Sequence, residues 1–361
     1  MSIRVLHVRS TIGMYGAEKV VLNLLQSAAS LDYHYALFCI EGTHPQSHLL
    51  AQAAADYAHK TLAYSTDKRL DKKIIQRIRV ELAQYDVVHT HDYKSLIYVC
   101  LARGFKAQPK LFHHVHGALG NTRMERIYAH IEKLLMRLVS GVITVSDVQQ
   151  QMLAAQLFAP RRICQIDNGT ALSTFTKKPA GHAELKLVMA ARFTAEKNHY
   201  LAVDVIQALT AQGIKAHLTC LGDGPLLEEI QHYAQTRGVQ AQIHFAGFVN
   251  NVTHYLQDAD ALLITSHTEG MPMAMLEAMA AGVPVVSTPV GQIPQIIRSA
   301  QCGATADNLT DMVQALAQFN NASAPVKSWG ENARLYIQQH CSVEKQLHDI
   351  HAFYAQAGLP C

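Results

Sequence analysis

The sequence predicts an α/β fold with two doubly wound domains, each built on a parallel sheet. Short apolar runs alternate with longer helical patterns along the whole chain, which indicates strands covered by helices on both faces. The 361 residues are about twice the length of a typical domain. A turn-rich segment, residues 168–183, separates two such series. We therefore expect one domain over residues 1–170 and another over 171–341, with a final helix near 342–361 packing back on the first.

Each expected strand is a short apolar run, and each expected helix is a longer pattern that follows it. The first domain is expected to hold strands at Ile3–Val8, Tyr35–Ile40, Asp86–His89, Lys110–Val115 and Gly141–Val145. Its helices are expected near Ala17–Ala29, Lys94–Arg103 and Thr122–Val139. The second domain is expected to hold strands at Leu185–Ala190, His217–Leu221, Gln242–Phe245, Ala261–Thr265 and Pro284–Ser287. Its helices are expected near Lys197–Ala211, Pro225–Thr236 and Pro272–Ala281.

The composition is that of a protein with packed cores. Apolar residues make up 49% and charged residues 16%, which excludes a disordered chain. No uncharged apolar run approaches the ~18 residues of a membrane span. The N-terminus, Met1–Arg9, alternates and carries two arginines, so it reads as a first strand rather than a secretory signal. Seven cysteines without a C-x-x-C pair indicate reduced thiols, and we expect a cytoplasmic protein.

The charge is unevenly distributed, with a formal +7 over residues 1–170 and −4 over residues 171–361. The segment Lys68–Arg79 holds six cations on a helical pattern whose apolar side is isoleucine. A second helix carries Arg123, Arg126, Lys133 and Arg137. Two interpretations stay open: solvated helix faces, or docking on an anionic membrane surface. No aromatic–basic motif supports nucleic-acid binding.

Two glycine-rich turns follow expected strands and open expected helices. The first contains Gly13 and Gly16, where the backbone could approach a phosphate, but it is neither a complete G-x-G-x-x-G nor a Walker loop. The second contains Gly222 and Gly224 before Pro225, a residue suited to a helix start. A plain tight turn explains either one equally well.

Arg192 and Lys197 follow the first strand of the second domain. Two cations at the carboxyl end of a strand can hold a diphosphate, with bidentate contacts from arginine and a point charge from lysine. Two solvated loop cations are the alternative from this segment alone. The sequence Asp258–Asp260 has the letters of a metal-binding Asp-x-Asp, but it leads into a buried strand, so we expect no metal there.

Two glutamates flank an expected helix start at Pro272, with Glu269 in the loop before it and Glu277 on the helix. At 1.5 Å per residue they would be about 12 Å apart along a helix, whereas a retaining glycosidase pair needs ~5–5.5 Å. They fit two ends of an elongated ligand instead, and the amides of the helix start favour an anion between them.

The first domain is rich in histidine, with His89, His91, His113, His114 and His116. A metal site is one interpretation, but no carboxylate or cysteine pattern completes it. The preferred interpretation is that His116 lies at the end of a strand and points into a cleft.

Together these segments resemble the retaining nucleotide-sugar glycosyltransferases of GT-B architecture, of the glycosyltransferase family 4 type (glycosyl transferases group 1). The resemblance runs the length of the chain and depends on the joint order and spacing of its motifs. They are the Gly13–Glu18 loop, Asp86–His91, His116-Gly117, Val145-Ser146, Asn168-Gly169, Arg192 with Lys197, Gly222–Pro225, and Glu269 with Glu277 followed by Ala278–Val286. Two positions depart from the family pattern, Tyr15 before Gly16 and Ala171 after Asn-Gly.

The resemblance implies two Rossmann-like domains facing each other across a cleft, with the acceptor on the first and the nucleotide sugar on the second. Arg192 and Lys197 would hold the donor diphosphate, and His116 would lie beside the donor sugar. Glu269 would contact the sugar hydroxyls and Glu277 the ribose. The implied donor-binding set is completed by Gly13, Gly16, Gly222, Gly224, Gly270, Met273 and Ala274.

The resemblance further implies transfer of a hexose from a UDP- or GDP-linked donor to a sugar or lipid-linked glycan. The anomeric configuration would be retained, and no metal or other cofactor would be needed. Such an enzyme would serve cell-surface polysaccharide or lipopolysaccharide biosynthesis, at the inner face of the cytoplasmic membrane if the basic helices dock there. Alternatives are a nucleotide-sugar epimerase or phosphorylase on the same fold, or a non-catalytic sugar-nucleotide-binding module.

Overall fold

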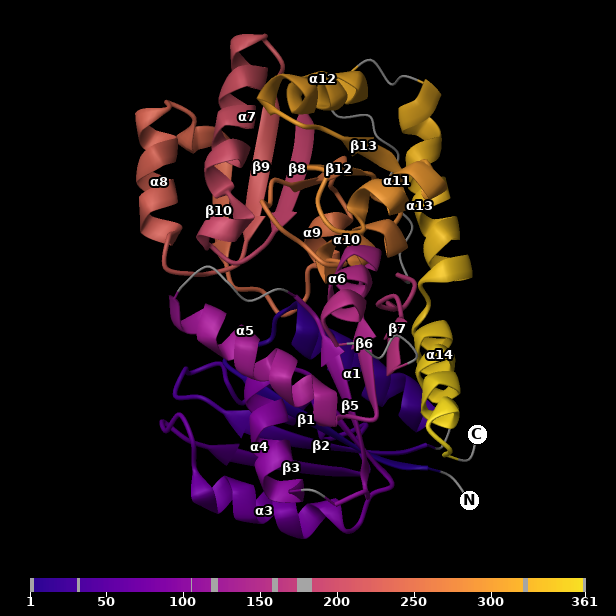
Figure 1. The fold of residues 1–361 in the computed structure, drawn as a ribbon. Coiled ribbons are helices and arrows are strands. Elements are labelled where there is room, and N and C mark those ends of the chain that lie inside the picture. Colours follow the sequence, from indigo (N-terminus) through magenta and orange to yellow (C-terminus); the bar gives the residue numbers. More distant parts are fainter. Residues whose placement is uncertain are drawn as a thin grey trace. The chain divides into compact units, whose positions relative to one another are not determined.

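The computed structural model describes residues 3–30, 33–104, 106–117, 123–157, 162–173, 184–320 and 324–359. The chain divides into two compact units, one formed by Met1–Gly169 with Val343–Cys361 and the other by Thr170–Ser342. Each unit is built on one parallel sheet (Figure 1). Residues 174–183 of the turn-rich segment, Thr122 and the side chain of Arg123 lie outside the described residues.

The first sheet has seven strands in the order β3-β2-β1-β4-β5-β6-β7, and all its neighbouring strands are parallel. The strands are β1 (Arg4–Thr11), β2 (His34–Glu41), β3 (Lys60–Ser65), β4 (Val87–Thr90), β5 (Lys110–Val115), β6 (Gly141–Thr144) and β7 (Ile163–Gln165). Every residue of β4 and β6 is buried. Central strands covered on both faces need apolar side chains on both, which is why these segments read as continuous apolar runs.

The helices of the first unit cover both faces of this sheet. They are α1 (Gly16–Ser30), α2 (Leu49–Ala54), α3 (Lys72–Leu82), α4 (Tyr93–Arg103), α5 (Arg123–Leu135), α6 (Asp147–Leu157) and α14 (Val343–Gln356). Right-handed crossovers place α1 and α2 on one face and α3, α4 and α5 on the other, because the strand order runs in opposite directions from β1 and from β4. The last helix, α14, returns to this unit and packs against α1.

The second sheet has six parallel strands in the order β10-β9-β8-β11-β12-β13. The strands are β8 (Leu185–Ala190), β9 (Ala216–Leu221), β10 (Ile243–Gly247), β11 (Ala261–Ile264), β12 (Val285–Ser287) and β13 (Gly303–Thr305). The helices are α7 (His199–Ala211), α8 (Leu227–Thr236), α9 (Thr253–Leu256), α10 (Met273–Ala280), α11 (Ile293–Ala300), α12 (Leu309–Asn320) and α13 (Ala324–His340). Both sheets therefore confirm the doubly wound fold that the strand–helix alternation predicts.

Each sheet has a point where the strand order reverses, between β1 and β4 in the first unit and between β8 and β11 in the second. The loops that leave the two strands diverge there to helices on opposite faces, so a crevice opens at the carboxyl ends of the strands. In open α/β sheets this crevice is where ligands bind. The sequence-predicted charged residues of the second unit, and most of the histidines of the first, follow these strands.

Candidate functional site

The switch point of the second unit carries an ion pair between its two flanking loops. Lys197, from the loop after β8, places Nζ 2.6 Å from Oε1 of Glu269, in the loop after β11. The same carboxylate oxygen accepts a hydrogen bond from Ser266 Oγ at 2.7 Å. The two charged side chains are 23% and 10% exposed. A lysine and a glutamate distant in the chain are thus fixed at one place, mostly buried but still reached by solvent.

Backbone contacts join these two loops further. Thr265 Oγ1 lies 3.0 Å from the carbonyl oxygen of Lys197, and the amide of His267 donates to the carbonyl oxygen of Glu196 at 2.8 Å. Asn198 closes the first loop with a φ of 49° and caps α7, accepting a hydrogen bond from the amide of Leu201. Asparagine tolerates this left-handed conformation better than most residues. The backbone therefore holds the ion pair in place.

The glycines of the β9–α8 turn support the loop of Arg192. A Cβ on Gly222 would lie 2.1 Å from the carbonyl oxygen of Ala191, and a Cβ on Gly224 would lie 2.6 Å from that of Phe193. Both have φ values that other residues rarely adopt, 143° and 152°. Only glycine lets this turn lie directly against the loop that carries Arg192. The structure thus gives Gly222 and Gly224 a positioning reason beyond a tight turn.

The loop of Glu269 has a similar support from Gly291, in the turn after β12. Gly291 has a φ of 57°, and a Cβ there would lie 2.4 Å from the carbonyl oxygens of Glu269 and Gly270. The amide of Gln292 donates to the carbonyl oxygen of Gly270 at 2.9 Å. Gly270 is therefore buried between the glutamate loop and the turn that supports it.

Helix α10 begins directly after the glutamate loop. Pro272 is its N-cap residue, and the amide of Met275 donates to the carbonyl oxygen of Pro272 at 3.1 Å. The amides of Met273 and Ala274 precede this first intrahelical hydrogen bond, so they point out of the helix start. Glu277, one turn further along α10, is partly exposed. Helix amides and a carboxylate can serve a phosphate and a polyol of one elongated ligand.

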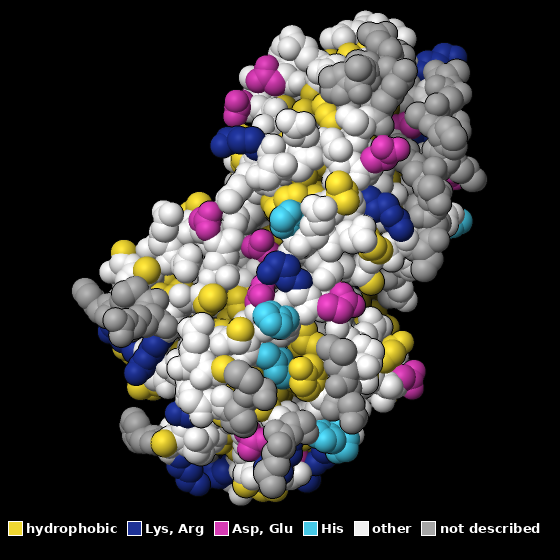
Figure 2. Space-filling model, turned by 90° about the vertical axis from the view of Figure 1, so that its right-hand side faces the viewer, with side chains coloured by type: hydrophobic (Ala, Val, Ile, Leu, Met, Phe, Trp, Pro, Cys, Tyr) yellow, Lys and Arg dark blue, Asp and Glu magenta, His cyan; other side chains and the backbone are white. Residues whose placement is uncertain are grey.

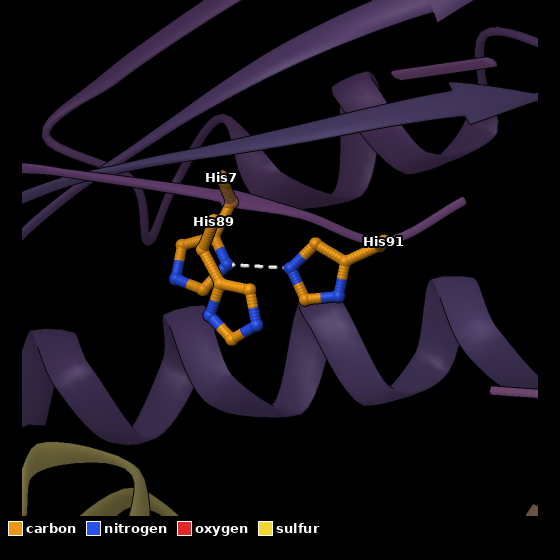
Figure 3. A group of neighbouring side chains, drawn as sticks. All are labelled: His7, His89 and His91. Atoms are coloured by element: carbon orange, nitrogen blue, oxygen red, sulfur yellow. Dashed lines mark hydrogen bonds between the residues drawn. The ribbon is translucent and has the colours of Figure 1, made fainter. Parts of the chain in front are cut away.

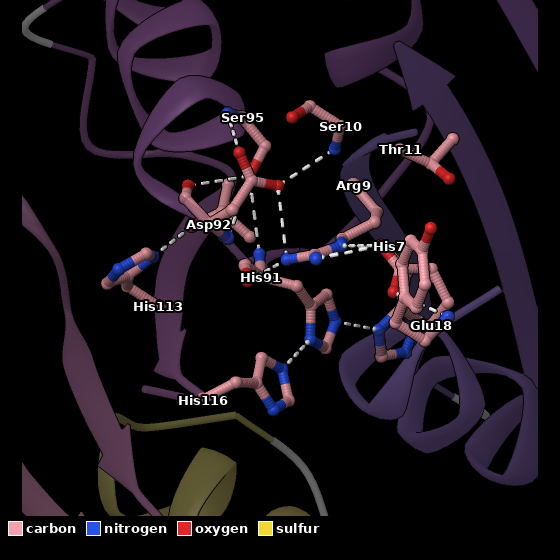
Figure 4. Close-up of polar contacts among 12 residues, drawn as sticks. His7, Arg9, Ser10, Thr11, Glu18, His91, Asp92, Ser95, His113 and His116 are labelled. Atoms are coloured by element: carbon pink, nitrogen blue, oxygen red, sulfur yellow. Dashed lines mark hydrogen bonds and ion pairs between the residues drawn. The ribbon is translucent and has the colours of Figure 1, made fainter. Parts of the chain in front are cut away.

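The first unit places a stack of five imidazoles beside its switch point. His7 lies on β1, His89 and His91 on or just after β4, and His114 and His116 on or just after β5. The register pairs His7 with His89. Neighbouring ring centroids are 4.1–5.6 Å apart. His7 Nδ1 is 2.7 Å from His91 Nε2 (Figure 3), and His91 Nδ1 is 3.0 Å from His116 Nε2 (Figure 4).

The stack is uncharged at neutral pH. Burial, followed by the unfavourable interaction with neighbouring histidines, lowers the pKa of His7 and of His114 to about 3. The same causes hold the pKa values of His89, His91 and His116 well below the usual value for histidine. A neutral imidazole donates one hydrogen bond and accepts one, so the chain from His7 through His91 to His116 fixes the tautomers of its members together.

Two trios of this stack lie close enough to hold a metal ion, His7 with His89 and His91, and His91 with His114 and His116. The candidate ligand atoms of each trio lie within 4.8 Å of one another. In each trio two of the candidate nitrogens already face each other at hydrogen-bond distance, His7 Nδ1 with His91 Nε2 and His91 Nδ1 with His116 Nε2. Neither trio includes an anionic ligand to offset a buried dication. The geometry favours a hydrogen-bonded stack.

An ionic network adjoins the stack (Figure 4). Arg9 Nε donates to Glu18 Oε1 at 2.9 Å, and Arg9 Nη1 donates to the carbonyl oxygen of His91 at 2.7 Å. Asp92 lies 3.6 Å from Arg9 Nη1 and caps α4 in a capping box. Burial alone would lower the pKa of Arg9, but Glu18 and Asp92 outweigh it and raise the pKa. The network fixes the ends of β1 and β4 relative to each other.

Gly13 and Gly16 lie where the sequence predicts them, between β1 and α1. Gly13 is buried, and a Cβ there would lie 2.7 Å from the ring of Tyr15. Gly16 is the exposed first residue of α1. Glu18 accepts a hydrogen bond from the amide of Tyr15 at 3.2 Å, the half of a capping box that a glutamate supplies. The departure at Tyr15 therefore places an aromatic ring against the first glycine.

Sequence reasoning missed four residues that build these sites: His7, Arg9, Asp92 and Gly291. The first three depend on which strands are neighbours, which the sequence alone does not specify. Arg9 interrupts an otherwise apolar strand, and Gly291 follows a short apolar run. The local sequence could therefore have drawn attention to both residues. His113, which the sequence singled out, instead pairs with Thr90 and Glu132 at 2.8 and 3.1 Å.

The basic segment before and within α3 lies on the surface of the first unit. All six cations of Lys68–Arg79 are exposed, whereas Ile74 and Ile78 are buried. Lysine and arginine side chains gather at the lower end of the face shown in Figure 2. Among the described residues, none of the helices combines the length and the apolar character that a bilayer span requires.

Family models match both halves of the chain. The model described as glycosyltransferase family 4 matches residues 14–174, and the model described as glycosyl transferases group 1 matches residues 173–336.

Among curated relatives, the putative colanic acid biosynthesis glycosyltransferase WcaL of Salmonella typhimurium is 30% identical over 172 residues. That match covers 45% of this chain and 42%, less than half, of the relative. The UDP-Gal:alpha-D-GlcNAc-diphosphoundecaprenol alpha-1,3-galactosyltransferase of Escherichia coli is 23% identical over 79% of both chains. Among solved structures, Anabaena HepE in complex with UDP and glucose superposes with a TM-score of 0.84 and 15% identity, covering 98% of this chain and 99% of the other.

Proposed function

The chain belongs to the group 1 and family 4 glycosyltransferases, and from this premise we propose that it transfers a hexose from a UDP- or GDP-linked donor to a glycan acceptor. The observation that carries the proposal is the Lys197–Glu269 pair at the switch point of the second sheet, with Arg192 in the same loop after β8. Cations, helix-start amides and carboxylates at one crevice match the parts of a nucleotide sugar. The complex of the related fold with UDP and glucose supports the same class of donor.

Each part of the donor has a partner in this arrangement. Arg192 and Lys197 neutralise the diphosphate and stabilise the charge that develops on the leaving nucleotide. The amides of Met273 and Ala274 add dipoles that favour phosphate or sugar oxygens. Glu269, already oriented by Lys197, accepts hydrogen bonds from sugar hydroxyls, and Glu277 accepts them from the ribose.

We propose that the reaction retains the anomeric configuration. The carboxylate of Glu269 is held by a lysine and a serine, so it is arranged as an acceptor of hydrogen bonds and not as an attacking group. Attack by the acceptor from the face of the departing phosphate then fits, with the phosphate taking the acceptor's proton. His116 is proposed to contact the transferred sugar as a neutral imidazole, the state that its buried surroundings impose.

Metal independence is part of the proposal. Two cations, Arg192 and Lys197, supply the positive charge that a divalent ion would otherwise bring. The Asp-x-Asp sequence has a structural use: Asp260 Oδ2 accepts a hydrogen bond from the amide of Lys186 at 2.9 Å, at the start of β11. That is the opposite edge of the sheet from the loop of Arg192 and Lys197.

The acceptor is proposed to be a sugar or a lipid-linked glycan of a cell-surface polysaccharide or lipopolysaccharide. The relative that acts on a diphosphoundecaprenol-linked sugar supports a lipid-linked acceptor, and the colanic acid relative supports the polysaccharide. With such an acceptor, we propose that the enzyme acts in the cytoplasm, at the inner face of the cytoplasmic membrane. The exposed cations of α3 suit an anionic surface there.

A donor panel tests the function. Purified protein is incubated with UDP- and GDP-sugars and with simple glycosides or membrane extract as acceptors, and release of the nucleoside diphosphate is measured. The proposal expects release from one donor class that increases with acceptor. Conversion of the donor to another free nucleotide sugar without acceptor would indicate an epimerase instead, and a requirement for inorganic phosphate would indicate a phosphorylase.

A further inference from the structure

Helix α5 and the turn after it expose a stripe of large apolar side chains. The stripe consists of Met124, Ile127, Ile131, Leu134 and Leu138, at spacings of three and four residues. These side chains are between 37% and 59% exposed. At 100° per residue the spacing places them on one side of the helix. The packed side of the helix is marked by Met136, which belongs to the core of the first unit, and by Leu135, which packs against that core.

A row of cations runs beside this α5 stripe. Arg126, Lys133 and Arg137 follow one another at about two-turn and one-turn intervals and, with His130, occupy the sector next to the apolar one. Arg126, His130 and Arg137 are exposed, and Lys133 is partly exposed. Glu132 points inward, where it pairs with His113 at 3.1 Å. Among the described side chains, the outward surface of α5 is therefore apolar along one strip and cationic along the next.

The neighbouring helices extend the same surface. α3 packs against α4 and α4 against α5, and Figure 1 shows the three side by side on one face of the first sheet. Val80 on α3 and Leu101 on α4 are 59% and 47% exposed. With Leu70, just before α3, and the α5 stripe, this layer holds eight of the thirteen large apolar side chains that the described residues expose. The exposed cations of α3 lie on the same layer.

We propose that the α5 stripe inserts into the interfacial region of an anionic bilayer, with the adjoining cations on the lipid phosphates. An apolar strip flanked by a cationic row is the pattern of a helix that lies in the membrane plane. The apolar strip would contact the boundary between headgroups and acyl chains. The cations would lie within a Debye length of the lipid phosphates. The proposal rests on the proposed function in one respect, since a lipid-linked acceptor would explain why the enzyme binds there.

Vesicle sedimentation tests the docking. The full chain is mixed with vesicles of phosphatidylcholine alone, or with about one third phosphatidylglycerol added, at low and high salt. Binding is expected only with the anionic vesicles, and it is expected to weaken as salt rises. The variant Ile127→Ser/Leu134→Ser should lose at least about tenfold in affinity. The matched control, Val148→Ser/Met152→Ser, removes two equally exposed apolar side chains from α6 and should bind like the wild type.

Tryptophan fluorescence measures insertion of the α5 stripe separately from binding. The chain has one tryptophan, Trp329, which lies on α13 and is 8% exposed. In the Ile131→Trp variant, a second tryptophan should shift to shorter emission wavelength with anionic vesicles and be quenched by brominated lipid, whereas wild-type emission should not change. An unshifted, unquenched Ile131→Trp overturns insertion, and equal binding of the stripe variant and its control overturns the docking surface.

Two further measurements distinguish membrane docking from dimerisation through the stripe and from failure of the proposed donor. A wild-type dimer that the stripe variant converts to monomer, seen by light scattering, would assign the stripe to a second copy of the chain and contradict the membrane proposal. Thermal stabilisation by UDP, measured without vesicles, should be the same in the stripe variant, its control and the wild type. Its absence in all three contradicts the UDP form of the proposed donor and leaves the sedimentation result standing.

Discussion

Lys197 and Glu269, separated by 72 positions in the sequence, form a 2.6 Å ion pair between the two loops that flank the switch point of the second sheet. Each loop packs against glycines whose positions leave no room for a side chain. Gly222 and Gly224 lie against the loop of Lys197, and Gly291 lies against the loop of Glu269. The charges are therefore positioned before any ligand arrives. Pre-positioned charge is the form of electrostatic catalysis that costs no reorganisation in the transition state.

Removing either cation should abolish most turnover. Arg192→Ala or Lys197→Ala should lose at least about 2.7 kcal/mol of transition-state stabilisation, as when one preorganised donor is removed. The readout is kcat/KM, with circular dichroism as the check on folding. Lys215→Ala, an exposed cation of the same unit outside the crevice, is the control and should behave like the wild type. Near-normal kcat in both site variants with intact folding would contradict the proposal that Arg192 and Lys197 hold the donor diphosphate.

Substitution of the two glutamates should impair the enzyme in different ways. Glu269→Ala should lower turnover most, because its carboxylate is proposed to contact the sugar hydroxyls. Glu277→Ala should weaken binding of the free nucleoside diphosphate, because its carboxylate is proposed to contact the ribose. Calorimetry with UDP and GDP decides between them. The division of roles is wrong if Glu277→Ala binds the nucleotide normally, or if Glu269→Ala alone loses it.

The strand–helix alternation predicted the fold class because buried parallel strands leave an apolar signal that needs no long-range information. Segments without that signal were missed. β3 is exposed or half-buried along its length, and β13 has only three residues, none of them buried, so neither forms an apolar run. Helices α11, α12 and α13 went unassigned although apolar residues recur along them. α12 follows β13, which leaves no apolar run, and α13 follows α12 with no strand between them.

The charged residues of the second unit could be identified from the sequence, but the pairing between them could not. Arg192, Lys197, Glu269 and Glu277 each carry a local motif, so the sequence identified them. The ion pair between Lys197 and Glu269 depends on β8 and β11 being neighbours, which strand order alone decides. The sequence did not predict the histidine stack for the same reason, because His7 joins the stack only through its register with β4.

Activity should survive removal of divalent metal. With Arg192 and Lys197 supplying the positive charge, EDTA should leave kcat unchanged within about twofold. The assay is release of the nucleoside diphosphate before and after chelation, with Mg²⁺ and Mn²⁺ added back separately. Activity that disappears with EDTA and returns with Mn²⁺ would show that the cations do not replace a metal.

The histidine stack should make the protein less stable in mild acid. The pKa of His114 is about 3 in the folded chain and near 6.5 in the unfolded one, so between these values the unfolded chain binds the extra proton. Stability is full above about pH 6.5 and falls as pH decreases, by up to about 1.4 kcal/mol per pH unit for each such histidine. His7, His89, His91 and His116 add to the same slope.

Urea unfolding at pH 7.5, 6.0 and 5.0 measures this slope, because these values span the unfolded histidine pKa of about 6.5. His114→Leu should be less dependent on pH than the wild type, whatever its absolute stability. The matched control is His217→Leu, since His217 is exposed on β9. An identical slope in the wild type and His114→Leu would mean that His114 is protonated in the folded protein.

The most direct test of the central claim is a thermal-shift panel of UDP- and GDP-sugars on the wild type and on Arg192→Ala/Lys197→Ala. At about 100 times its Kd, a bound donor adds about 2.7 kcal/mol to stability. We predict that at least one nucleotide sugar raises the Tm of the wild type, and that the double variant, with its own Tm close to the wild type, shows no such increase. A panel in which no nucleotide sugar stabilises the wild type, or in which the double variant is stabilised equally, would contradict the assignment of the donor to this site.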